Sequence, residues 1–233
     1  RRELADYIRE GGYQLIHCHG SRANMIGALL RKPTGLPVVS TVHSDYRLDY
    51  LGRPLSRITY GTINTIALRK LDYRIGVSDA MVDLLIDRRF DPERIFAIYN
   101  GLDFTPRTPS MDRATFFRSV GLDADDTCVV AGIAARLNPV KDIATLIRGF
   151  AKAHAEYPPL RLLIAGDGEE MEGLKKLAAD LGVAKEVCFA GWVSDTDSFY
   201  HALDINTLTS ISETFPYVLT EGARAGLPTI SSK

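Results

Sequence analysis

Two positively charged side chains stand five residues apart in a segment that follows an apolar run. The segment is Gly132-Ile133-Ala134-Ala135-Arg136-Leu137-Asn138-Pro139-Val140-Lys141-Asp142, and its two bases are Arg136 and Lys141. A fixed guanidinium with a nearby ammonium can stabilise the charge of a diphosphate. The alternative is a surface loop with two solvated bases, because Pro139 and Asp142 are ordinary residues for the start of a helix.

A second segment combines two carboxylates with the start of a helix. It is Ser212-Glu213-Thr214-Phe215-Pro216-Tyr217-Val218-Leu219-Thr220-Glu221-Gly222-Ala223. Pro216 suits the first helical position, and the unpaired backbone N–H groups there can bind an anion. Glu221 lies about a turn and a half further along the helix. The helix start would bind phosphate and the two carboxylates would bind hydroxyl groups, a combination that fits a nucleotide sugar. The alternative is one acid that favours the helix dipole and one solvated acid.

Both segments fall where a predicted strand gives way to a predicted helix. Apolar runs without strict alternation are typical of strands covered on both faces, as in parallel sheets. Their repeated alternation with helices predicts an α/β architecture of doubly wound parallel sheets, whose ligands bind beyond the carboxyl ends of the strands. The predicted strands are Tyr13–His19, Pro37–His43, Tyr73–Val77, Arg94–Ile98, Thr127–Ala134, Leu160–Ala165, Glu186–Ala190, Asp204–Leu208 and one that starts at Thr229. The predicted helices are Ser21–Arg31, Pro54–Leu71, Ser78–Asp87, Lys141–Glu156, Glu170–Leu181 and Pro216–Ala225, with a short one around Asp112–Val120.

The alternation breaks once, in a stretch with two prolines and an acidic turn. We therefore predict a first domain at residues 1–105, a linker at 106–126 and a second domain at 127–233. Residues 1–102 hold 15 Lys and Arg against 11 Asp and Glu, whereas residues 103–233 hold 13 against 18. This difference in charge suggests two units with different partners. Both halves look like copies of one Rossmann-like architecture.

The composition narrows the classes of function. The 233 residues carry a formal net charge of −1, so no nucleic-acid partner is expected. Apolar runs are too short to span a bilayer, and the three separated cysteines, Cys18, Cys128 and Cys188, predict buried thiols of a reducing compartment. The first residue is not Met, and we expect a piece of a longer protein that lacks both ends.

Taken together, the two segments resemble the signatures of the large retaining glycosyltransferase family 4. Arg136–Lys141 has that family's Arg-Leu-x-Pro-x-Lys pattern, and Glu213 and Glu221 form its Glu-x7-Glu pattern, at the expected separation. The resemblance implies the GT-B fold, in which two Rossmann-like domains face a cleft. Further matching stretches are Ile16-His17-Cys18-His19, Val39-Ser40-Thr41-Val42-His43, Gly76-Val77-Ser78, Tyr99-Asn100-Gly101-Leu102-Asp103, Leu162-Leu163-Ile164-Ala165-Gly166-Asp167-Gly168 and Phe189-Ala190-Gly191-Trp192-Val193.

By that resemblance, the predicted catalytic residues are His43, Glu213, Arg136 and Lys141. Arg136 and Lys141 should bind the donor diphosphate, and Glu213 should contact the transferred sugar. His43 should lie near the sugar and the acceptor, whereas a lone histidine at a strand end is otherwise a capping or core residue. The resemblance also implies donor binding by Glu221, on the nucleotide ribose, and by Phe215, Pro216 and Tyr217. The tight turn with Gly166 and Gly168 passes near the nucleotide in this fold.

The implied reaction transfers a hexose-type sugar, with retention, from a nucleoside diphosphate sugar to a glycan or lipid-linked acceptor. No metal and no cofactor besides the donor are expected, because the cations and the helix start would stabilise the departing diphosphate. The alternatives are a sugar-nucleotide epimerase with the same fold and a non-catalytic fragment that binds nucleotide sugars. The expected location is the cytoplasm.

Three other sequence patterns are weaker evidence for a functional site. His17 and His19 share one face of a strand, yet no carboxylate pair lies near them in sequence to complete a metal site. Asp195-Thr196-Asp197 spells a metal-binding D-x-D, but its position favours a helix N-terminus with capping acids. Asn100-Gly101 predicts a turn with positive φ.

Residues 47–74 form a basic amphipathic element with six bases against two acids. Such an element could rest on an anionic membrane at its inner face, near a lipid-linked acceptor. The alternative is an ordinary solvated helix with one core face.

Overall fold

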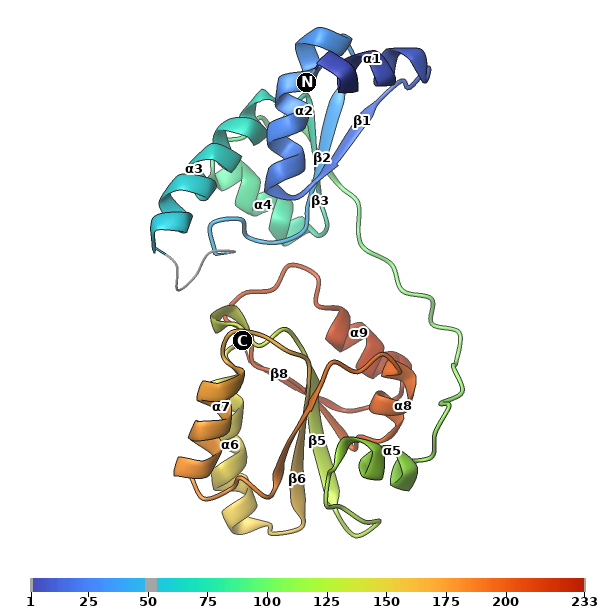
Figure 1. Cartoon of the computed structure of the whole chain (residues 1–233), viewed down its shortest axis with the longest axis vertical. Helices are drawn as coiled ribbons and strands as arrows, with labels where there is room; N and C mark the ends of the chain where they lie inside the picture. Colours follow the sequence, from blue (N-terminus) through green and yellow to red (C-terminus); the bar gives the residue numbers. More distant parts are fainter. Residues whose placement is uncertain (1, 49–53, 233) are drawn as a thin grey trace. The chain divides into compact units, whose positions relative to one another are not determined.

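The computed structural model describes residues 2–48 and 54–232, and of residues 54–60 it describes the backbone alone. The chain forms two compact units (Figure 1). The first contains the residues up to Gly101 together with Glu213–Phe215. The second contains Leu102–Ser212 and the residues from Pro216 onward.

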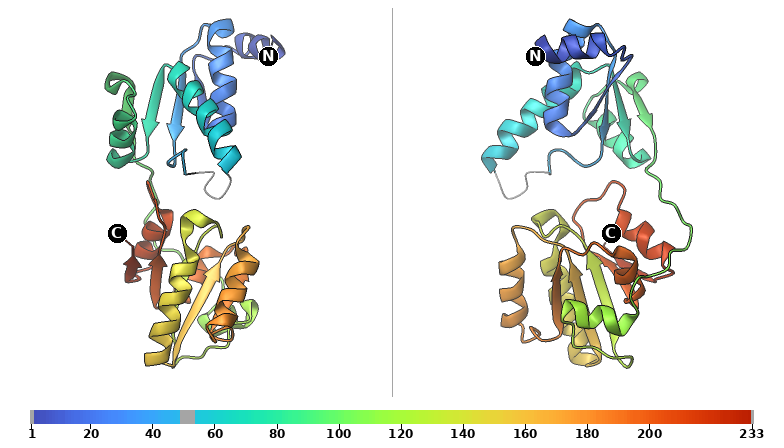
Figure 2. Two further views of the ribbon diagram at one scale, coloured as in Figure 1. Left: turned by 90° about the vertical axis from the view of Figure 1, so that its left-hand side faces the viewer. Right: turned by 45° about the vertical axis from the view of Figure 1, so that its right-hand side comes forward.

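The first unit is built on a four-stranded, fully parallel sheet with the order β1-β2-β3-β4. Its strands are β1 (Ile16–His19), β2 (Val38–Val42), β3 (Tyr73–Gly76) and β4 (Ile95–Ala97). Its helices are α1 (Arg2–Glu10), α2 (Gly20–Thr34), α3 (Pro54–Lys70) and α4 (Asp79–Asp87), with a 3₁₀ turn, η1, at Pro92–Arg94. Figure 2 shows α2 and α3 on one face of the sheet and α4 on the other.

A buried polar network fixes α2 and α3 on their face of the sheet. The Asn24 amide donates to Asn64 Oδ1 at 3.0 Å, and the Ser40 hydroxyl donates to Asn24 Oδ1 at 2.6 Å. Gly27 allows close packing, since a Cβ there would lie 2.5 Å from the sulfur of Cys18. Because side chains alternate along a strand, His17 and His19 project from the opposite face.

The second unit contains a five-stranded parallel sheet with the order β7-β6-β5-β8-β9. Its strands are β5 (Val129–Ala134), β6 (Leu160–Ala165), β7 (Val187–Gly191), β8 (Ile205–Leu208) and β9 (Thr229–Ser231). Its helices are α5 (Arg113–Val120), α6 (Ile143–Glu156), α7 (Met171–Asp180), α8 (Thr196–His201) and α9 (Tyr217–Arg224), with a 3₁₀ turn, η2, at Pro139–Lys141. The strand order reverses between β5 and β8, which makes their carboxyl ends a topological switch point.

Each face of this second sheet has its own apolar core. Ile133 and Ile164 pack on the face covered by α6 and α7, whereas Val130 and Leu163 pack on the face covered by α5 and α8. Ile143, Ile147 and Phe150 form the buried face of α6. Strands covered on both faces confirm the predicted doubly wound α/β architecture.

Some local expectations were wrong. Neither Asn100 nor Gly101 has a positive φ. Instead, the Ile98 N–H bonds to the Gly76 carbonyl at 3.0 Å, which extends the pairing of β4 past its end. The three cysteines are free, but only Cys18 is fully buried.

The predicted membrane element at residues 47–74 lies partly outside the described residues, which exclude 49–53 and the side chains of 54–60. Among the helices that the structure describes, none combines the length and the apolar character needed to cross a membrane.

Candidate active site

The loops after β5 and β6 stay hydrogen-bonded to each other beyond the strands. The Ala135 N–H bonds to the Ala165 carbonyl and the Leu137 N–H to the Asp167 carbonyl, both at 2.9 Å. This pairing needs glycine on the β6 side. A Cβ at Gly166, whose φ is +127°, would lie 1.9 Å from the Ala135 oxygen, and one at Gly168 would lie 2.1 Å from the Leu137 oxygen. The pairing of the two loops therefore requires glycine at both positions, independently of the donor contact expected from sequence.

Arg136 and Lys141 occupy the loop that these contacts hold in place. Leu137, between them, is fully buried, while Arg136 is exposed. Asn138 caps η2, and its side-chain oxygen accepts the Lys141 N–H at 3.3 Å. Asp142 follows with φ 44° and ψ 48°, a left-handed conformation that is costly for a residue other than glycine. The backbone of the loop that carries Arg136 and Lys141 is therefore held in one conformation by these contacts.

The same loop is bonded to the one that follows β8. The Ile211 N–H donates to the Val140 carbonyl at 2.8 Å, and the Thr209 hydroxyl donates to the Lys141 carbonyl at 3.2 Å. These contacts join the carboxyl ends of β5 and β8 at the switch point. The segment with Glu213 then leads into α9, with Pro216 as a cap residue that has no side-chain hydrogen bond.

Two contacts orient α9 and Glu221. The Asn206 amide donates to the Val218 carbonyl at 2.9 Å, and a Cβ at Gly222 would lie 2.4 Å from that amide nitrogen. The hydroxyl of buried Tyr200 donates to Glu221 Oε2 at 2.8 Å. The Tyr200 hydroxyl therefore holds the Glu221 carboxylate at one oxygen, and Glu221 is not a freely solvated acid.

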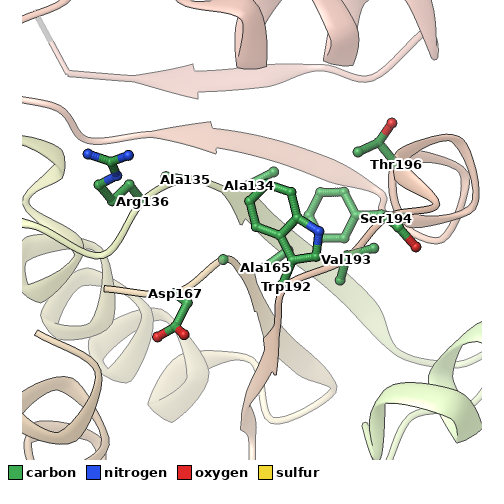
Figure 3. A pocket seen from close by; sticks show the side chains of 11 residues that line it. Ala134, Ala135, Arg136, Ala165, Asp167, Trp192, Val193, Ser194 and Thr196 are labelled. Carbon is green, nitrogen blue, oxygen red and sulfur yellow. The ribbon is translucent and has the colours of Figure 1, made fainter. Parts of the chain in front are cut away.

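A pocket of about 610 Å³ opens beyond the carboxyl ends of β5, β6 and β7 (Figure 3). Its lining is largely apolar and includes Ala134, Ala165 and Phe199. Arg136 lies at one end of it, and Ser194 and Thr196 lie at the other. Trp192 lines the pocket with 84% of its surface exposed. Gly166 also lines this pocket.

In the first unit, three histidines cluster at the carboxyl ends of β1 and β2. His19 Nδ1 lies 2.8 Å from His43 Nε2, and His17 Nε2 lies 2.8 Å from the Thr41 hydroxyl. The rings of His17 and His19 are 4.3 Å apart, and those of His19 and His43 are 5.1 Å apart. Loss of solvent lowers the pKa of His43, and the positive charges of protonated His19 and His17 lower that pKa further. His43 is thus an exposed residue at a strand end and is favoured in its neutral form.

The D-x-D pattern is a helix start, as expected. Asp195 accepts the Ser198 N–H at 3.0 Å as the cap of α8, and Asp197 pairs with Arg224 at 2.8 Å. Within residues 2–48 and 54–232, no group of three or more His, Cys, Asp or Glu side chains is arranged to hold a metal ion.

The predicted site residues divide between the two units. Among them, the first unit holds His43, Glu213 and Phe215, whereas the second holds Arg136, Lys141, Gly166, Gly168, Pro216, Tyr217 and Glu221. Sequence reasoning missed Trp192 and Tyr200. The position of Trp192 directly after a predicted strand could have marked it, but the partner of Tyr200 could not be inferred from spacing.

Comparison with known families decides the classification. The model described as "Glycosyl transferases group 1" matches residues 113–233, and "Glycosyltransferase Family 4" matches residues 1–105. The chain belongs to the glycosyl transferases group 1. This confirms the family predicted from the two signatures.

Several curated glycosyltransferases are similar to this family member. The D-inositol 3-phosphate glycosyltransferase of Mycobacterium marinum is 27% identical, over 95% of this chain and 49% of its own length. The UDP-Gal:alpha-D-GlcNAc-diphosphoundecaprenol alpha-1,3-galactosyltransferase of Escherichia coli is 26% identical, over 98% of this chain and 60% of its own length. The chain thus spans about half to three fifths of these relatives.

Solved structures show the same fold. The Anabaena protein Alr3699/HepE, in complex with UDP and glucose, superposes with a TM-score of 0.84 and 23% identity, over 100% of this chain and 62% of that one. The apo form of the lipopolysaccharide outer core galactosyltransferase WaaB gives a TM-score of 0.63 at 22% identity, over 99% and 59%. The two units of this chain have the Rossmann-like GT-B fold.

We predict that Gly168→Ala destabilises the second unit by about 1–3 kcal/mol, because the new methyl group meets the backbone of Leu137. Gly173→Ala is the matched control. Gly173 lies inside α7 with open space around its Cβ position, so alanine should stabilise the unit by about 0.5–1 kcal/mol. Urea denaturation measures both. Equal stability of the two variants would contradict the structural role of Gly168, and lost nucleotide binding at unchanged stability would favour a donor contact.

We also predict that His43 titrates below the ordinary histidine midpoint of about 6.5. His19→Ala should raise that midpoint, because it removes a neighbouring positive charge. NMR titration of the histidine ring protons measures both values, with His201 of the second unit as an internal control. A His43 midpoint above the ordinary value in the unsubstituted protein would contradict this environment.

Proposed function

We propose that this chain carries out glycosyl transfer from a nucleoside diphosphate sugar to a glycan or lipid-linked acceptor. The observation that carries the proposal is the loop with Arg136 and Lys141, bonded to the β8–α9 loop at the switch point and bordering the pocket. Family membership and the named activities of the relatives support it. UDP and glucose in the HepE complex support a nucleotide-sugar donor.

The pocket suits the nucleoside part of the donor. Its apolar lining can take a flat base, and Trp192 offers an aromatic face for stacking. Arg136, at one end, would then meet the first charged atoms beyond the nucleoside, which are those of the diphosphate. The Glu221 carboxylate would accept hydrogen bonds from the ribose hydroxyls.

Charge stabilisation by the protein carries the chemical step in this proposal. Cleavage of the bond between sugar and diphosphate leaves oxocarbenium character on the sugar and negative charge on the phosphates. Arg136, Lys141 and the N–H groups at the start of α9 stabilise that charge, with no metal ion and no further cofactor. Glu213 contacts the transferred sugar. Neutral His43 either accepts a hydrogen bond from a hydroxyl of the sugar or the acceptor, or donates one to it. The acceptor hydroxyl oxygen forms the new bond to the anomeric carbon, its proton passes to the departing diphosphate, and the anomeric configuration is retained.

The basic element at residues 47–74 would bring the enzyme to an anionic membrane from the cytoplasmic side. Among the side chains described there, Ile63 and Ile66 are exposed, and Arg69 and Lys70 end the same helix. Sedimentation with anionic vesicles should show binding that weakens as salt is added. Ile66→Ser with Lys70→Ala should reduce it, whereas the exposed Lys152→Ala should not. Absence of salt-sensitive binding removes the membrane contact and leaves the transfer reaction untouched.

We predict that Lys141→Ala and Glu213→Ala each lower turnover of the full-length protein by more than about tenfold, because each removes a charge placed at the reacting bond. Sugar transfer is measured with a panel of nucleoside diphosphate sugars, in the presence of excess EDTA. The matched controls are Lys152→Ala on the exposed side of α6 and Glu172→Ala, whose side chain is 85% exposed. Both should keep normal rates.

The products separate this function from its alternatives. Near-normal turnover of both site variants would contradict the assignment. Conversion of the donor alone into an epimer would indicate an epimerase, and nucleotide binding without any sugar release in the presence of acceptor would indicate a binding module. Loss of activity in EDTA that added Mg²⁺ or Mn²⁺ restores would contradict metal independence, and an inverted anomeric signal in the product would contradict retention.

A further inference from the structure

Tyr200 is a buried residue, and its hydroxyl, the only polar atom of its side chain, is directed at the predicted site residue Glu221. It lies on α8 with 1% of its surface exposed, and its ring packs edge-on against Phe199 at 5.1 Å. Its hydroxyl donates to Glu221 Oε2 at 2.8 Å. Burial raises the pKa of Tyr200, and the Glu221 charge raises that pKa further. The hydroxyl therefore keeps its proton at neutral pH and acts as the donor of this hydrogen bond.

A second contact between the same two helices fixes the geometry. Arg224, whose side chain is only 6% exposed, pairs with Asp197 at 2.8 Å. Glu221 and Arg224 stand three residues apart on α9, and Asp197 and Tyr200 stand three apart on α8, so each pair shares one helix face. α9 has eight residues and cannot hold its orientation alone. The two contacts together set its position and its rotation against α8.

These contacts leave the other oxygen of the Glu221 carboxylate, Oε1, to accept hydrogen bonds from a ligand. Tyr200 engages Oε2, and a carboxylate has further acceptor positions, mainly on its other oxygen. A carboxylate held at one oxygen presents the other in a single direction, and the entropy of ordering it is lost on folding and not on ligand binding. A pair of vicinal hydroxyls is the ligand that matches such a group.

We propose that Tyr200 is a positioning residue that orients the Glu221 carboxylate toward the ribose hydroxyls of the donor nucleotide. This inference rests on the proposed function, because it takes the ligand of Glu221 to be a nucleoside diphosphate. Tyr200 does not touch the ligand and acts through Glu221. The Asp197–Arg224 pair keeps α9 in place when the Tyr200 hydroxyl is removed, so the effect of that hydroxyl can be measured separately.

The test compares Tyr200→Phe with Tyr157→Phe in the full-length protein. Tyr200→Phe keeps the buried ring and removes only the hydroxyl, whereas Tyr157 is an exposed tyrosine of the same unit, with 47% of its surface exposed. Calorimetry is carried out with the nucleoside diphosphate that gives the largest thermal shift among those of uridine, guanosine, adenosine and cytidine, and with its 2′,3′-dideoxy form. Thermal unfolding of each variant monitors the fold.

We expect Tyr200→Phe to weaken binding of the ribonucleotide by about three- to tenfold and to leave binding of the dideoxy form unchanged. Tyr157→Phe should change neither value. In the Glu221→Gln background, Tyr200→Phe should cause little further loss. In turnover, KM for the donor should rise while kcat stays near its original value.

The outcomes distinguish this inference from the proposed function. Equal weakening of both nucleotide forms would mean a merely structural role and would overturn the inference, as would unchanged binding of the ribonucleotide. If the unsubstituted protein binds none of the four diphosphates, the proposed function fails and the inference fails with it. Should Tyr200→Phe not fold, Glu221→Asp, which withdraws the carboxylate from Tyr200, must show the same selective loss for the ribonucleotide.

Discussion

The candidate site depends on backbone hydrogen bonds between loops that continue the parallel sheet past its strands. The loops after β5 and β6 pair through Leu137 and Asp167, and the loops after β5 and β8 pair through Val140 and Ile211. Parallel strands place all their carboxyl ends at one edge, so loops far apart in sequence meet there. The close approach leaves no room for a Cβ at Gly166 or Gly168. A single array of main-chain bonds thus positions both the pocket wall and the two cations.

This constraint also explains how cations could replace a metal ion in the proposed reaction. Mobile side chains in water stabilise a developing charge poorly, because they must be ordered as the charge forms. Here the backbone that carries the two cations is ordered on folding. Leu137 is buried as an anchor and Asn138 caps the short turn that follows. The left-handed conformation of Asp142 adds a local cost, which is expected where a backbone is fixed for a site and not for stability.

The parts of the molecule that sequence predicts are those governed by local rules. The burial of both faces of the second sheet follows from its apolar strands, and the cap at Asp195 follows from an acid before an apolar helix face. The turn at Asn100-Gly101 was predicted wrongly, because continued pairing of Ile98 with β3 overrides the local preference. α1 was not predicted at all. Tyr200 shows the limit most clearly, since its ring fits the pattern of a core residue and its hydroxyl has a hydrogen-bond partner, Glu221, that only the fold reveals.

The two units differ in how they control charge. In the second, basic and acidic side chains are paired or capped around α8 and α9, so that Glu221 and Arg224 have fixed partners. In the first, three histidines stand together: loss of solvent lowers the pKa of His17 and of His43, and the charges of neighbouring protonated histidines lower both pKa values further. A neutral imidazole can both donate and accept a hydrogen bond, whereas its protonated form can only donate. The proposed contact of His43 with a sugar hydroxyl calls for the neutral form, which loss of solvent and, to a smaller extent, the neighbouring histidine charges both favour.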